Sequence, residues 1–263
     1  MLTIGQYLRP QTLEEAYTLS QNKRNVVIGG MLWLKMQNRS VEAAIDLCDL
    51  GLDTIEETEQ EFRIGAMVSL HQMETHPGLQ ALTQGAIADS VKQIVGVQFR
   101  NLATVGGSLY GKFGFSDVLT MLMVLDAKVE LYHDGTMSLP DFVNRRSQRD
   151  ILVRVILPKT PVRTVYLSQR NTATDFPVLT CALAQREQDL VCAIGARPQR
   201  AMLFRDEAGI LSSGITEERA KAFGQDIAER ASFGANLRAS AAYRKAICPV
   251  LVRRGLMALK EGC

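Results

Sequence analysis

The order of apolar and polar positions along the 263-residue chain predicts two successive patterns. Up to about residue 160, short β-branched segments alternate with short helical segments. Strands and helices are told apart here by period-two alternation against a 3.6-residue apolar period. Strands are expected at residues 25–30, 43–48, 62–66, 128–133 and 151–157, and helices at residues 12–19, 69–74, 79–95 and 118–125.

Capping residues mark the starts of these helices. Thr12 is followed three residues later by Glu15, which is a capping-box arrangement. Ser69 can cap a short helix that ends before Pro77, and Asp117 can cap the apolar helix that follows it.

The pattern changes after residues 158–163, which hold two prolines and two basic residues and have no apolar period. Strands are expected at 164–167, 176–184 and 190–194, and helices at 216–231 and 240–260. A sheet followed by helices is an α+β layout. The linker predicts two domains, at residues 1–160 and 164–263.

Composition and charge narrow the function classes. Apolar residues make up 46%, charged residues 22%, and the net charge is +2, which gives no reason to expect a nucleic acid or an anionic membrane as partner. Residues 1–9 lack a secretory pattern, and no apolar run approaches the roughly 20 residues of a membrane span. We therefore expect a cytoplasmic protein.

The cysteines and histidines offer no obvious metal or disulfide framework. The five cysteines are scattered, with no C-x-x-C spacing, so we expect any iron–sulfur cluster to be on another chain. No Ser-His-Asp or Cys-His grouping supports hydrolysis. No catalytic or metal-ligating residue is assigned.

Two glycine pairs carry the candidate chemistry: Gly29-Gly30 and Gly106-Gly107. Glycine allows unusual backbone angles and close approach of a ligand, and successive free N–H groups can bind a diphosphate. A tight turn is the alternative for each pair alone. No G-x-G-x-x-G follows a strand and no P-loop motif is present, which disfavours a Rossmann-type nicotinamide or ATP site.

The run from Gln98 to Leu109, QFRNLATVGGSL, resembles the second FAD loop of the molybdenum-hydroxylase flavoproteins. That family includes the medium subunits of xanthine dehydrogenase and carbon monoxide dehydrogenase. The run from Val27 to Met31 resembles the first FAD loop, and weaker similarity extends through nearly the whole chain. The resemblance implies a two-lobed p-cresol methylhydroxylase-type FAD-binding domain, with lobes at about 1–55 and 56–160. A C-terminal α+β domain with an antiparallel sheet and helices would follow.

The resemblance also implies which residues contact the cofactor. The two loops would hold the diphosphate and ribityl chain from opposite sides, and Asp117 would accept a hydrogen bond from an FAD hydroxyl. Arg170 and Asp175 would lie in the segment that faces the flavin. The expected cofactor-binding residues are Val27, Ile28, Gly29, Gly30, Met31, Leu32, Ile94, Ala103, Thr104, Val105, Gly106, Gly107, Ser108, Asp117, Ile151 and Leu152.

Some positions depart from the family pattern. Met31 and Leu32 replace the usual Thr and acidic residue, and each lost hydrogen bond costs about 1 kcal/mol. Ser108 stands where Asn is usual. These changes indicate weaker or differently tuned flavin binding.

The resemblance implies an FAD-binding electron-transfer subunit of a molybdenum hydroxylase complex. Electrons would arrive from [2Fe–2S] clusters on one partner and leave to an acceptor such as NAD+, and molybdopterin would belong to another partner. Two alternatives remain: a non-enzymatic assembly subunit with weakened or lost FAD binding, and a stand-alone flavin oxidoreductase.

Overall fold

The computed structural model describes residues 1–146, 148–187 and 189–262. It forms two compact units that interleave in sequence. The first unit contains Met1–Met73, Val97–Gly111 and Asp126–Lys159, and the second contains Glu74–Gly96, Lys112–Leu125 and the chain from Thr160 onward. The sequence-based division into domains 1–160 and 164–263 stays a prediction.

The N-terminal part of the first unit is a parallel three-stranded sheet with one helix. Its strands are β1 (Thr3–Leu8), β2 (Val26–Ile28) and β3 (Ser40–Asp46), in the order β1-β3-β2. The helix is α1 (Leu13–Ser20), and its N-cap Thr12 accepts the amide of Glu15 at 3.1 Å, as predicted. Strand β1 was not predicted because its side chains are largely exposed and give little apolar signal.

The rest of the first unit is built on an antiparallel five-stranded sheet in the order β4-β5-β8-β6-β7. The strands are β4 (Ile55–Glu57), β5 (Glu61–Gly65), β6 (Lys128–Leu131), β7 (Gly135–Ser138) and β8 (Leu152–Pro158). The accompanying short helices are η1 (Leu34–Met36), α2 (Leu70–Thr75), α5 (Val97–Leu102), α6 (Val105–Tyr110) and α8 (Leu139–Asn144). A buried apolar cluster of Ala16, Ile45, Leu47, Leu52, Ile151 and Val153 joins α1 and β3 to β8.

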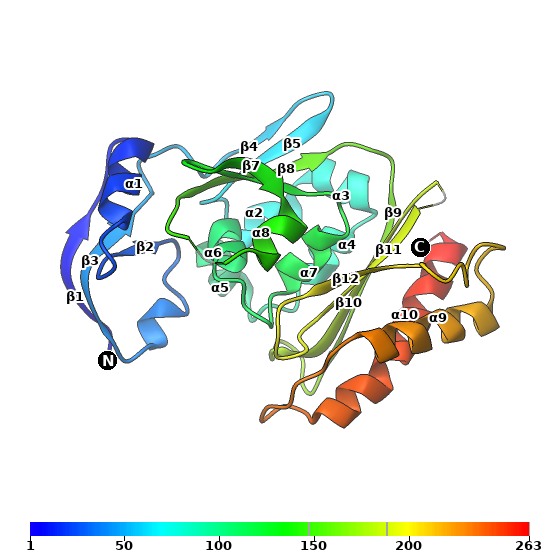
Figure 1. Cartoon of the computed structure of the whole chain (residues 1–263). Coiled ribbons are helices and arrows are strands. Elements are labelled where there is room, and N and C mark those ends of the chain that lie inside the picture. The colour runs from blue at the N-terminus through cyan, green and yellow to red at the C-terminus, as the bar shows by residue number, and fades with distance from the viewer. Residues whose placement is uncertain (147, 188, 263) are drawn as a thin grey trace. The chain divides into compact units, whose positions relative to one another are not determined.

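The second unit is built on an antiparallel four-stranded sheet in the order β12-β11-β10-β9. Its strands are β9 (Arg163–Arg170), β10 (Pro177–Arg186), β11 (Asp189–Gly195) and β12 (Met202–Arg205). The long helices α9 (Glu217–Arg230) and α10 (Ala241–Glu261) cover one face (Figure 1). The other helices of this unit are α3 (Pro77–Thr83), α4 (Ala86–Val91) and α7 (Asp117–Met123).

Successive side chains of β10 point to opposite faces of the sheet, so this strand packs against helices on both faces. Cys181 and Leu183 pack in the core formed with α9 and α10. Thr180, on the opposite face, lies 3.1 Å from Thr120 of α7, measured between the hydroxyl oxygens. The predicted α+β layout with antiparallel sheets and helices is confirmed.

Three local predictions were wrong. The helix expected over residues 79–95 is broken into α3 and α4, because Gln84 and Gly85 adopt left-handed backbone angles, with φ of 46° and 84°. The segment expected to be a loop around Gln98 forms α5 and α6. Ser116, and not Asp117, caps α7, since its hydroxyl accepts the amide of Leu119 at 3.1 Å.

Candidate cofactor-binding site

The two glycine bends lie against each other in the first unit, although about 75 residues separate them in the sequence. A Cβ on Gly30 would stand 1.7 Å from the carbonyl oxygen of Leu102, and one on Gly29 would stand 2.6 Å from the hydroxyl oxygen of Thr104. Cβ atoms do not approach backbone atoms so closely, so this contact requires glycine on the first bend. The structure therefore brings the two predicted loops to one place.

The first bend leaves main-chain donors free. Within the described residues, the amides of Gly30, Met31 and Leu32 donate to no acceptor of the chain. Met31 has a left-handed backbone with φ of 57°, a conformation that costs a non-glycine residue about 1–2 kcal/mol. Strained backbone with free amides suits an anionic oxygen such as that of a diphosphate.

The amides of the second bend are already engaged. Val105 donates to Val68 at 2.9 Å, Gly106 donates to Ala66 at 2.8 Å, and Gly107 donates to the Thr104 hydroxyl at 3.1 Å. The expectation that both bends present bare amides is therefore wrong for this one. The reason is that the bend begins α6, where Thr104 is the N-cap, and that residues 66–68 supply the carbonyls for the other two amides.

The second bend offers a different surface. Gly107 is exposed, and the nearest atom to a Cβ there would be the Thr104 hydroxyl at 3.0 Å. Gly106 is buried against Ala66, whose carbonyl oxygen would lie 2.7 Å from an added Cβ. Gly106 thus serves packing, while Gly107 leaves room for close approach of a ligand. The Ser108 hydroxyl donates to the Thr104 carbonyl at 2.9 Å.

The remaining predicted residues of this unit are mostly buried. Ile28, Leu32, Ile151 and Leu152 have little exposed surface, and Ile151 belongs to the apolar cluster around Ala16. The others in this group, Val27 and Ala103, are partly buried.

Asp117, in the second unit, lies in a buried polar network. Its Oδ1 accepts hydrogen bonds from the Tyr166 hydroxyl and from Arg170 Nη2, both at 2.5 Å. Asp117 is 4% exposed, and burial raises the pKa of its carboxyl group to about 6, against the opposing effects of Arg170 and Tyr166. Arg170 also donates to the Asp175 carbonyl, so the three residues predicted in this region, Asp117, Arg170 and Asp175, are connected.

Sequence reasoning missed Tyr166. It lies on β9 and no local motif marks it, because its role depends on a hydrogen bond to Asp117, which is 49 residues away in the sequence. Ile94 is also in the second unit, and its contact with the cofactor stays a prediction.

The four cysteines that the structure describes lie outside both bends. Cys181, Cys192 and Cys248 are buried in the core under α9 and α10, Cys48 is exposed, and these four are free thiols. Burial raises the pKa of Cys248 and of Cys192, which disfavours their thiolates. Cys263 lies outside the described residues.

The α+β unit holds two touching glycine bends, and the free amides of the first bend suit the diphosphate of a dinucleotide. Residues 3–160 match the family described as the FAD-binding domain in molybdopterin dehydrogenase, and the chain belongs to this family. It is an FAD-binding subunit of an oxidoreductase of the molybdenum hydroxylase class.

Individual relatives agree with this family. The chain is 26% identical over 258 residues to the uncharacterized protein YgfM of Escherichia coli K12, covering 95% of this chain and 94% of that protein. It is 32% identical over 148 residues to the nicotinate dehydrogenase FAD-subunit of Eubacterium barkeri, covering 52% and 50%. A carbon monoxide dehydrogenase structure from Hydrogenophaga pseudoflava superposes with a TM-score of 0.88 at 21% identity, covering 98% of each chain, which shows the shared fold.

Among the described residues, the search for a helix both long and apolar enough to span a bilayer found none.

Proposed function

We propose that this chain passes electrons through FAD inside a molybdenum hydroxylase complex. A partner carrying [2Fe–2S] clusters supplies the electrons, another partner carries molybdopterin, and an acceptor such as NAD+ receives them. FAD supplies the redox chemistry when bound, while the protein positions it and shapes its electrostatic environment. The contact between the two glycine bends is the observation that carries this proposal.

The two bends have different tasks in this proposal. The free amides of Gly30, Met31 and Leu32 bind diphosphate oxygens. Gly107 lets the cofactor approach the backbone. The Thr104 hydroxyl, which lies beside Gly29, is the polar group that the second bend offers to FAD. The roles of Asp117 and Ile94 toward the cofactor rest on the family resemblance.

The partners are proposed on the same grounds. Relatives include a subunit named as the FAD-subunit of nicotinate dehydrogenase and another named as the medium subunit of nicotine 6-hydroxylase, and such names denote one part of a larger enzyme. Copurification of the full chain with an iron–sulfur protein and a molybdopterin protein tests this proposal. NAD+ as the acceptor is tested by reducing the purified complex chemically, removing excess reductant, adding NAD+, and following flavin reoxidation together with NADH formation.

Replacing Thr104 with alanine is expected to weaken FAD binding roughly fivefold, because one hydrogen-bonding group contributes on the order of 1 kcal/mol. The measurement is titration of the full chain with FAD, followed by flavin fluorescence. Thr104→Ser keeps the hydroxyl and the helix cap, and it is expected to bind like the wild type. Wild-type protein that cannot be reconstituted with FAD would reject the function itself.

Two observations favour the assembly-subunit alternative. The amides of the second bend are used inside the protein, and Met31 and Leu32 lack the hydrogen-bonding groups usual in the family. Copurification with intact partners but without flavin, even after added FAD, would support that alternative.

A further inference from the structure

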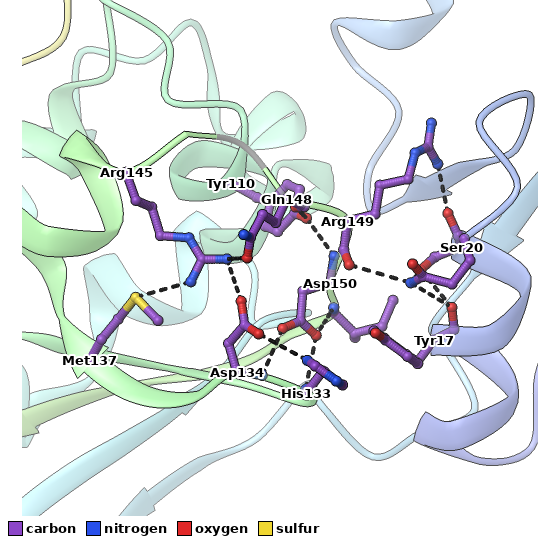
Figure 2. Close-up of polar contacts among 12 residues, drawn as sticks. Tyr17, Ser20, Tyr110, His133, Asp134, Met137, Arg145, Gln148, Arg149 and Asp150 are labelled. Carbon is purple, nitrogen blue, oxygen red and sulfur yellow. Dashed lines mark hydrogen bonds and ion pairs between the residues drawn. The ribbon is translucent and has the colours of Figure 1, made fainter.

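Arg149 forms hydrogen bonds with the segment that leads into the first glycine bend. Its Nη1 donates to the carbonyls of Ser20 at 2.6 Å, Asn22 at 3.0 Å and Asn25 at 3.3 Å, and its Nη2 donates to the carbonyl of Lys23 at 2.8 Å. Figure 2 shows Arg149 beside Ser20, the last residue of α1. The carbonyls at a helix end lack intrahelical partners, and a guanidinium is suited to several of them at once.

This segment has a short path to the cofactor site. β2 begins at Val26, one residue after the last carbonyl that Arg149 binds, and has three residues before Gly29. A strand of three residues has few ladder hydrogen bonds of its own. Arg149 is one of the contacts that hold the start of this strand, together with the hydrogen bond from the Glu42 amide to the Arg24 carbonyl at 2.9 Å.

The residues on either side of Arg149 contact the helix that begins at the second bend. The hydroxyl of Tyr110, at the end of α6, donates to the Gln148 carbonyl at 2.8 Å and accepts the amide of Asp150 at 3.0 Å. Residues 148–150, which we name the brace, thus contact the segments attached to both glycine bends (Figure 2).

Asp150 fixes the brace to the five-stranded sheet. Its Oδ1 accepts the amides of His133 at 3.0 Å and Ile151 at 2.7 Å, and its Oδ2 accepts the amide of Asp134 at 3.0 Å. The acidic groups near His133 could suggest a cation site, but Arg145 Nη2 lies 2.5 Å from Asp134 Oδ2 and already neutralises that carboxylate. The cluster holds the β6–β7 turn and the brace together.

We propose that Arg149 and Tyr110 are positioning residues that set the relative placement of the two glycine bends through the brace. FAD affinity then depends on two side chains, Arg149 and Tyr110, whose polar groups form hydrogen bonds within the chain. This inference rests on the proposed function, since it assigns a consequence for FAD binding. Its structural part, the anchoring of both bend segments by one loop, can be tested without cofactor.

Hydrogen exchange of the cofactor-free full chain tests the anchoring. Arg149→Met is expected to speed exchange at residues 26–32, and Tyr110→Phe is expected to speed exchange at residues 105–110. Arg149→Lys keeps the charge but cannot reach four carbonyls, so it is expected to show most of the same effect. Arg146→Met, an exposed neighbour, is the matched control and is expected to leave both segments unchanged. Unchanged exchange at residues 26–32 in both Arg149 variants overturns the inference.

FAD titration of the same proteins tests the consequence. Arg149→Met and Tyr110→Phe are each expected to raise the FAD Kd roughly tenfold. The double variant is expected to lose less than the product of the two factors, because both act through one loop. A wild-type Kd in Arg149→Met overturns the inference while leaving the proposed function intact. Failure of the wild type to bind FAD overturns both. Fully multiplicative losses in the double variant also overturn it, since they indicate two independent supports.

Discussion

Gly30→Ala is expected to abolish FAD binding and to destabilise the first unit by more than about 3 kcal/mol. The added methyl group would stand 1.7 Å from the Leu102 carbonyl oxygen, and both atoms in this contact are fixed by backbone. The chain can relieve such a clash only by moving the two bends apart, which also separates the groups proposed to bind the diphosphate. The measurements are chemical unfolding of the full chain and FAD titration.

Gly107→Ala is expected to weaken FAD binding without destabilising the fold, so it distinguishes these two effects. Gly107 is exposed within α6, where alanine is favoured over glycine by roughly 0.5–1 kcal/mol, and its Cβ would meet only the Thr104 hydroxyl. We expect unchanged or higher stability together with at least about tenfold weaker FAD binding. Normal FAD binding by Gly107→Ala would show that this surface is not in contact with the cofactor.

Arg170→Met is expected to destabilise the second unit by about 3–5 kcal/mol near neutral pH, because it leaves the buried Asp117 carboxylate without its cation. The pKa of Asp117 is already raised to about 6 by burial, and loss of Arg170 raises it further. A raised pKa means that the folded state binds the proton more tightly than the unfolded state. The difference from the wild type should therefore grow as pH rises above about 6 and shrink at lower pH, where the carboxyl group is protonated.

Arg244→Met provides a matched control for this pH dependence. Arg244 is also buried in the second unit, but its acceptors are the carbonyls of Val178, Gly234 and Ala239 and the side-chain amide oxygen of Asn236. None of these groups titrates, so its loss should cost stability equally across the same pH range. Unfolding of both variants between pH 5 and 8, measured by denaturant titration, compares them. A pH-independent loss in Arg170→Met would refute the assigned charge interaction.

Local signals in the sequence predicted most of the secondary structure. The caps at Thr12 and Ser69 are confirmed, since a hydroxyl three residues before an amide is a short-range interaction that the order of residues defines. Elements with weak apolar alternation, such as β1 and β4, were missed because their side chains are largely exposed.

The sequence by itself determined the α+β class and the two glycine pairs, because both depend on residue types and their immediate neighbours. Only the tertiary structure decided which amides stay free, since the carbonyls of Ala66 and Val68 that occupy the second bend come from a segment about 40 residues away. It also decided that Tyr166 and Arg170 meet Asp117, and that Tyr110 contacts the loop that contains Arg149. Hydrogen bonds between distant segments depend on how the segments pack, and the apolar periodicity of either segment does not indicate them.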